Sequence, residues 1–117
     1  MNIDKDLVAA SATPLVLAIL SEGESYGYAI IKRVAELSGG ELAWTDGMLY
    51  PLLHRLERNG LVESFWARLE GVRRRKYYRL TRAGAEHLDR QRRQWQVVDR
   101  AMRGIWRAAL DPASQPI

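Results

Sequence analysis

The chain has 117 residues, of which 47% are apolar and 27% charged, and a net charge of +4, a composition typical of one folded domain with a modest core. It contains no cysteine, which excludes disulfides and thiolate metal sites, and its two histidines, His54 and His87, lie too far apart to suggest a metal site. The longest apolar run, residues 14–20, is too short to span a bilayer, and the first residues lack the layout of a signal peptide. We therefore expect a cytoplasmic protein with no cofactor and no membrane contact.

Two helices are predicted at the start of the chain. The apolar run follows Thr13-Pro14, a favourable N-cap and N1 pair, but residues 4–12 are also compatible with a helix. The first helix therefore begins either at Pro14 or near Asp4 with a kink at Pro14, and it should end at Gly23. Ser25 is expected to cap the second helix, which Gly39-Gly40 ends.

A third helix and a β-ribbon are predicted next. Thr45 should cap a helix over residues 46–58, with an inward stripe of leucines and Pro51 as a possible kink. The pattern then changes to two β-prone segments, residues 61–69 and 72–80, joined by a hairpin turn at Glu70-Gly71. Thr81 should cap a long last helix that reaches about residue 109.

This order predicts a mainly α fold with a two-stranded β-wing (α+β), a winged helix-turn-helix followed by a long helix. We expect residues 1–80 to form the DNA-binding domain, residues 81–110 a dimerisation helix, and residues 111–117 a frayed tail. In such a fold the third helix can enter the major groove while the ribbon lies along the phosphates.

Positive charge is concentrated in the second half of the chain. Residues 1–46 carry three basic and seven acidic side chains, whereas residues 47–117 hold the other fifteen basic and seven acidic ones. Arg74, Arg75 and Lys76 belong to a run of four cations on the second strand, where alternate side chains point to opposite faces. Phosphates would neutralise their mutual repulsion, so an anionic partner is indicated. The alternative is that these residues only make the wing soluble.

Candidate DNA contacts on the helices follow from the same geometry. Thr45, Gly47 and Met48 lie in the first turn of the third helix, the part that usually reaches bases. The side of this helix opposite the leucines also carries Tyr50, Pro51 and His54, and the second helix and its start add Tyr26 and Lys32. Tyr50 could instead be a half-buried packing residue, and His54 a solvated one.

Three stretches resemble the PadR family of bacterial transcriptional regulators. They read SYGYAIIKRV, GMLYPLLHRLERNGLVESFW and RRKYYRLTRAG, and the resemblance extends over about residues 5–107. It implies a winged helix-turn-helix homodimer, joined by its C-terminal helix, that represses transcription from an inverted-repeat operator. It also implies that the basic wing contacts phosphate or the minor groove. Leu69 and Val72 at the wing tip depart from the family, in which polar residues or glycine are common.

The last helix carries a heptad of the kind found in coiled coils. The seam consists of Leu88, Gln91, Trp95, Val98, Met102, Ile105 and Ala109. We expect Leu88, Val98, Met102 and Ile105 to form the dimer interface, with help from apolar residues of the N-terminal helix.

Trp95 is an unusual residue for such a seam. Its surroundings, RRQWQVVD, resemble the small PadR subfamily with one C-terminal helix, in which multidrug-binding regulators occur. The resemblance implies that Trp95 and its symmetry mate sandwich flat aromatic or cationic compounds, with Asp99 and Leu7 near the rim. The alternative is a closed dimer core.

Three other functions receive less support from the sequence. No nucleophile–base pair, metal set or phosphate loop supports an enzyme, and the lack of cysteine disfavours a metal-sensing winged-helix protein. An interaction module that kept the fold but lost DNA binding is the remaining alternative, and the basic wing argues against it.

Overall fold

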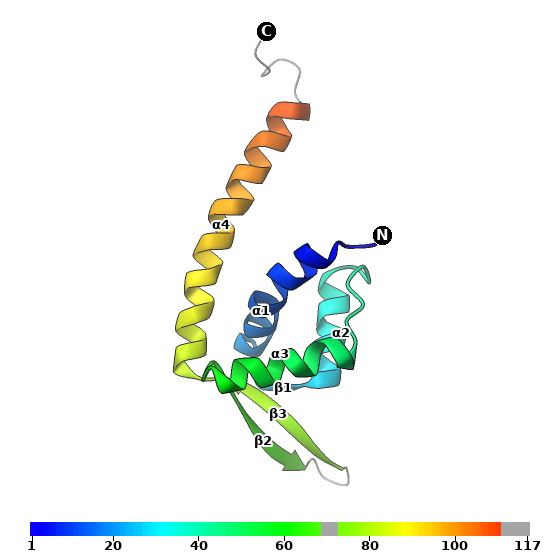
Figure 1. The fold of residues 1–117 in the computed structure, drawn as a ribbon, viewed down its shortest axis with the longest axis vertical. Coiled ribbons are helices and arrows are strands. Elements are labelled where there is room, and N and C mark those ends of the chain that lie inside the picture. Colours follow the sequence, from blue (N-terminus) through cyan, green and yellow to red (C-terminus); the bar gives the residue numbers. More distant parts are fainter. Residues whose placement is uncertain (69–72, 111–117) are drawn as a thin grey trace.

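A computed structural model describes residues 1–68 and 73–110, which form a winged helix-turn-helix with a long C-terminal helix (Figure 1). The elements are α1 (Lys5–Ser21), β1 (Ser25–Tyr26), α2 (Gly27–Leu37), α3 (Asp46–Arg58), β2 (Val62–Arg68), β3 (Arg74–Leu80) and α4 (Arg82–Leu110). The predicted fold class is therefore confirmed. The predictions for the hairpin turn at Glu70-Gly71, for the tip residues Leu69 and Val72, and for residues 111–117 fall outside the described residues.

The first helix begins at Lys5 with Asp4 as its N-cap and runs through Pro14 without interruption. The alternative start at Pro14 is thus wrong, although proline removes one backbone hydrogen bond from the helix interior. Helix α1 packs against α2, β3 and α4. These contacts bury Ala12, Val16, Leu17, Ile19 and Leu20 and compensate for the missing bond.

The prediction that Ser25 caps the second helix is wrong. Ser25 and Tyr26 form the short strand β1, which pairs with Tyr78 and Tyr77 of β3, so the wing is a three-stranded sheet of order β1-β3-β2. Helix α2 begins at Gly27 and has no side-chain cap. The ladder to β3 holds Ser25 extended, which overrides its capping preference.

The other two caps are confirmed. Thr45 Oγ1 accepts a hydrogen bond from the Met48 N–H at 3.3 Å, and Thr81 Oγ1 accepts one from the Gly84 N–H at 3.0 Å. Residues Gly39 and Gly40, which end α2, both have positive φ values. Glycine adopts these angles without steric cost.

The core lies where the inner faces of α1, α2 and α3 meet the base of the wing. Its fully buried side chains include Leu17, Ile30, Leu49, Leu53 and Tyr78. Burial raises the pKa of the Tyr78 phenol, and the negative charge of Glu57 raises it further. Because Tyr78 fills the core from the C-terminal end of β3, the strand is anchored at this end and projects from the domain at the other.

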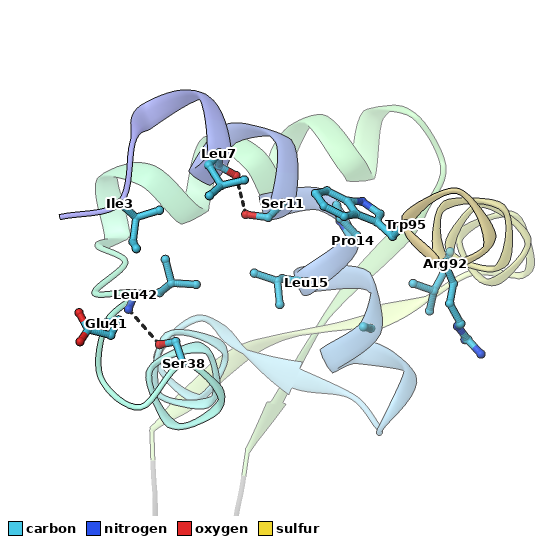
Figure 2. Close-up of a pocket in the computed structure, with 12 residues that line it drawn as sticks. Ile3, Leu7, Ser11, Pro14, Leu15, Ser38, Glu41, Leu42, Arg92 and Trp95 are labelled. Carbon is cyan, nitrogen blue, oxygen red and sulfur yellow. Dashed lines mark hydrogen bonds between the residues drawn. The ribbon is translucent and has the colours of Figure 1, made fainter. Parts of the chain in front are cut away.

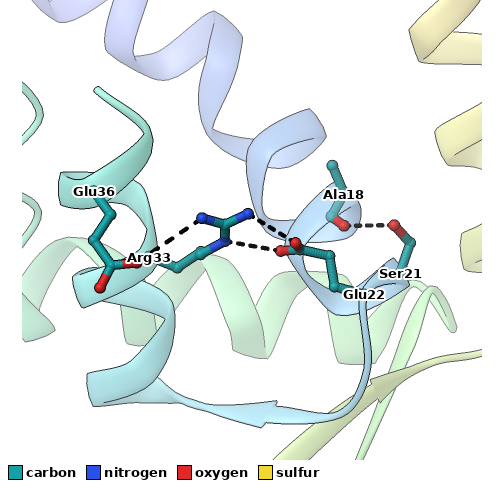
Figure 3. Close-up of polar contacts among 5 residues, drawn as sticks. All are labelled: Ala18, Ser21, Glu22, Arg33 and Glu36. Carbon is teal, nitrogen blue, oxygen red and sulfur yellow. Dashed lines mark hydrogen bonds and ion pairs between the residues drawn. The ribbon is translucent and has the colours of Figure 1, made fainter. Parts of the chain in front are cut away.

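An ion-pair cluster fixes the end of α1 to α2. The Arg33 guanidinium donates to Glu22 from Nε at 3.0 Å and from Nη2 at 2.8 Å, and Glu36 lies 3.9 Å from Nη1 (Figure 3). The hydrogen bond from Arg33 lowers the pKa of the Glu22 carboxyl. The pair bridges the turn before β1 at the surface, where such an ion pair contributes only modestly to stability.

Gly84 sets the angle at which α4 leaves the wing. A Cβ at this position would lie 1.9 Å from the carbonyl oxygen of Leu61, so only glycine allows the first turn of α4 to approach the start of β2. Gly104, further along α4, has open space around it.

We expect Gly84→Ala to lower the free energy of unfolding by at least about 1–3 kcal/mol, because the clash is with backbone rather than with a flexible side chain. The matched control is Gly104→Ala, which should raise it by up to about 1 kcal/mol because alanine is the better helix former. Thermal and urea unfolding would measure both. Equal stability of the two variants would contradict the contact at Leu61.

Candidate nucleic-acid interface

Helix α3 presents one buried and one exposed face. Leu49, Leu52, Leu53 and Leu56 are buried, and the opposite side exposes Gly47, Tyr50, Pro51 and His54. Thr45 caps the first turn of the helix through the Met48 N–H. Of the predicted first-turn residues, Thr45 and Gly47 are exposed, whereas Met48 is half-buried and packs against the core. A Cβ at Gly47 would meet only the Thr45 hydroxyl, at 3.9 Å.

The basic residues of β3 lie over aromatic rings. Arg75 lies 4.4 Å from the centre of the Tyr26 ring, Arg74 lies 5.1 Å from that of Trp66, and Lys76 Nζ lies 5.7 Å from that of Tyr78. Alternation along the strand sends Arg75 to one face of the sheet and its two neighbours to the other. The rings hold the long side chains in place through cation–π contact.

These three cations have no ion-pair partner among residues 1–68 and 73–110. Arg79, on the same strand, differs, because its Nε lies 2.7 Å from Glu63 and its Nη1 lies 3.8 Å from Glu24. Within the described residues, positive charge is therefore neutralised at Arg79, at the base of the wing, and has no ion-pair partner at Arg74, Arg75 and Lys76. An uncompensated cluster of this kind attracts a polyanion.

A cleft of about 410 Å³ separates α3 and the start of α2 from the wing. It is lined by Tyr26, Gly27, Tyr28, Tyr50, Trp66, Arg75 and Lys76. The Tyr50 hydroxyl reaches so close to Gly27 that a Cβ there would lie 2.4 Å from it. The cleft thus brings Tyr26, Tyr50, Arg75 and Lys76, four of the predicted contacts, to one place.

Some predicted residues lie apart from this cleft. Lys32 is exposed on α2 and His54 is exposed farther along α3, and neither lines it. Sequence reasoning in turn overlooked Gly27, Tyr28 and Trp66. The period-two pattern of β2 could have identified Trp66, since it lies opposite Lys76 and shares its face.

A second cavity, of about 570 Å³, lies between α1, the end of α2 and α4. Its lining is largely apolar and includes Leu7, Pro14, Leu15, Leu42 and Trp95 (Figure 2). Leu7 and Trp95, two of the three residues that the resemblance assigns to a ligand site, both line this cavity. Asp99 does not line the cavity and instead accepts a hydrogen bond from Arg103 at 2.8 Å.

The predicted seam of α4 is exposed along most of its length. Met102 is 44% exposed, and Val98 and Ile105 are also exposed. Leu88 differs, because it is only 5% exposed and belongs to the core of its own protomer. It therefore offers little surface to a partner, and the free apolar stripe begins near Trp95.

Neither a membrane-spanning helix nor a metal-binding group is found among residues 1–68 and 73–110. No helix in these ranges combines the length and apolar content needed to cross a membrane, and no group of three acidic, histidine or cysteine side chains is placed to bind a metal ion.

Comparisons with known proteins agree with this geometry. The sequence model of the "Transcriptional regulator PadR-like family" matches residues 16–90. The transcriptional regulator YqjI of Escherichia coli is 31% identical over 85 residues, which cover 73% of this chain but only 39% of that protein. A transcriptional regulator from Clostridium thermocellum superposes with a TM-score of 0.77 at 27% identity, covering 87% of this chain and 96% of the other. A PadR family regulator from Eggerthella lenta gives 0.72 at 35% identity, covering 86% of each.

Proposed function

The chain belongs to the PadR-like family of transcriptional regulators, and we propose that it is a homodimeric repressor of an inverted-repeat operator in double-stranded DNA. The family consists of DNA-binding regulators, so the chain is not an enzyme. Because its partner is chromosomal DNA, we place its action in the cytoplasm. The division into a DNA-binding domain, residues 1–80, and a dimerisation helix, residues 81–110, is part of this proposal.

DNA binding is supported by the three cations of the wing, which have no ion-pair partner among the described residues and lie beside the exposed face of α3. Arg74, Arg75 and Lys76 are held on rings rather than on carboxylates, and Tyr50 faces the same cleft. We assign phosphate or minor-groove contact to the wing and to Tyr26, with Lys32 and His54 at the margin. Tyr50 is assigned a phosphate contact as well, and base contact falls to the first turns of α3, through Thr45, Gly47, Met48 and Pro51.

The salt dependence of binding tests the wing assignment. Each phosphate contact that is lost should reduce the slope of log K against log salt by about 0.9, because fewer counterions are released. Replacing Arg74, Arg75 and Lys76 with alanine should therefore weaken binding to every duplex and flatten the slope. The control is Arg100→Ala, which removes a charge from α4, a helix that runs away from the wing (Figure 1).

A triple variant that binds as tightly as wild type at every salt concentration would contradict the assignment. If wild type itself binds no duplex, the chain is better described as an interaction module that kept the fold. The assay thus separates the two candidate functions.

Dimerisation is supported by the exposed stripe on α4. Val98, Met102 and Ile105 recur at heptad spacing and are exposed in the described part of the protomer. A solvent-exposed apolar stripe of this length is typical of a protein–protein contact. We propose that two copies of α4 meet along it, with apolar residues of α1 beside them.

Analytical ultracentrifugation of charged variants tests the seam. We expect wild type to sediment as a dimer at micromolar concentration and Met102→Glu as a monomer, because the seam would have to bury a charge. Val97→Glu is the matched control, since Val97 is 60% exposed on the same helix but lies off the seam. Dimers of both variants, or a monomeric wild type, would contradict the proposed interface.

The cavity beside Trp95 supports a response to small molecules. Its lining is largely apolar, its volume is within the range of drug-sized sites, and an indole stands at its edge. We propose that flat aromatic, often cationic, compounds bind between Trp95, Leu7 and the partner's copy of the same surface. We assign Asp99, one turn along α4, to the rim of the site in the dimer, where its ion pair with Arg103 would have to open before its charge could attract a cation. Such a ligand releases DNA only if it binds the free and DNA-bound states with different affinity.

Titration with planar cationic dyes tests this site. Dyes should quench indole fluorescence in wild type and lose most of their affinity in Trp95→Ala, because stacking on the ring is removed. Trp106→Ala is the control, since Trp106 lies on α4 outside the cavity. Quenching that survives in Trp95→Ala favours a closed dimer core, and dye binding without change in operator affinity would contradict a regulatory role.

A further inference from the structure

Trp66 has a setting that the core and the dimer seam do not explain. It lies on β2 opposite Lys76, on the face of the sheet that carries Tyr78 into the core. Along this face of β2, Val62 is buried, Ser64 is half-buried and Trp66 is 58% exposed. The indole therefore lies beyond the core, on the projecting part of the wing.

Its neighbours on that face are positively charged. Lys76 is its partner in the β-ladder, and the Arg74 guanidinium lies 5.1 Å from the centre of its ring. Arg68 follows two residues later on the same strand, so it shares this face. A large exposed ring among three cations suits a partner that alternates anionic groups with apolar ones. The sugar–phosphate backbone of a nucleic acid has this alternation.

The indole also faces the space beside the recognition helix. Trp66 and Lys76 line the wing side of the 410 Å³ cleft, and Tyr50 lines it from α3. DNA that lies against α3 and against the wing cations would pass over this cleft. The indole is then within its path, with an N–H that can only donate a hydrogen bond.

On the basis of the DNA binding proposed above, we infer that Trp66 itself contacts the DNA backbone next to α3. Its ring packs on a deoxyribose while its N–H donates to a phosphate oxygen. Arg74, stacked on the other side of the ring, holds it in position and contacts a phosphate of its own. Trp66 is thus a neutral contact within a surface that otherwise acts through charge.

Because Trp66 is neutral, its contribution to DNA binding can be distinguished from that of the neighbouring cations by the salt dependence of affinity. A neutral side chain releases no counterion, so its loss should lower affinity without changing the salt slope. The probe is a duplex selected by wild type from a random-sequence pool, titrated at several KCl concentrations by fluorescence anisotropy. We expect Trp66→Ala to bind about five- to tenfold more weakly, the value of one lost hydrogen bond, with the wild-type slope. Arg74→Ala should reduce the slope by about 0.9.

A second readout follows the indole directly. Bound DNA should protect one indole of wild type from acrylamide quenching, and this protection should be absent in Trp66→Phe. The control is Trp106→Phe, because Trp106 is also 58% exposed but lies on α4. Thermal unfolding of each variant checks that the fold is intact.

Three results would overturn the inference. Unchanged affinity of Trp66→Ala would show that the ring does not touch DNA. A second such result has two parts: Trp66→Ala reduces the salt slope as Arg74→Ala does, and the variant with both substitutions binds no more weakly than Arg74→Ala alone. Trp66 would then act only by positioning the arginine. Shielding of Trp66 before DNA is added would mean that another copy of the chain covers it. Absence of any salt-dependent binding by wild type would instead overturn DNA binding as a whole.

Discussion

The strand β3 meets two opposite demands within seven residues. At its C-terminal end Tyr78 is fully buried and Leu80 packs against the core, while its N-terminal end carries successive cations, of which Arg74 is exposed and Arg75 and Lys76 are half-buried. The buried end fixes the register of the sheet, because a shift by one residue would place a charge in the core. The charged end can then be held in a repulsive arrangement that it would not adopt alone. Both strands that flank β3, and through them the start of α2, take their positions from it.

Aromatic rings make this arrangement possible. Neighbouring carboxylates neutralise the positive charge of an arginine, as Glu63 and Glu24 do for Arg79. A neutral aromatic ring positions an arginine without cancelling its charge. The wing uses the first solution at its base and the second toward its tip. Its side chains are thus ordered before DNA arrives, which reduces the entropy lost on binding.

Most of the fold could be predicted from local signals. Thr45 and Thr81 each precede a segment whose apolar residues recur at helical spacing, and paired glycines end α2. The ribbon is marked by a change in the spacing of apolar residues, from every three or four residues to every second residue. Where the prediction for Ser25 was wrong, and where the start near Asp4 holds over the one at Pro14, tertiary contacts overrode local preference. Ser25 pairs with a strand far along the chain, and the packing of α1 carries the helix through proline. The site was predictable in residue type and position, but not in its pairing of cations with rings, because no local signal indicates that Arg75 lies over Tyr26.

The pairing of Ser25 with Tyr78 has a consequence for synthesis on the ribosome. The first three helices are made before β3, yet their apolar faces are closed only when Tyr78 enters the core. At typical rates of bacterial translation the chain between these two residues takes roughly 3 to 10 s to make. Until Tyr78 is made, the residues it covers, among them Leu17 and Ile30, lack part of their native packing, so the core closes later than it would through local contacts alone.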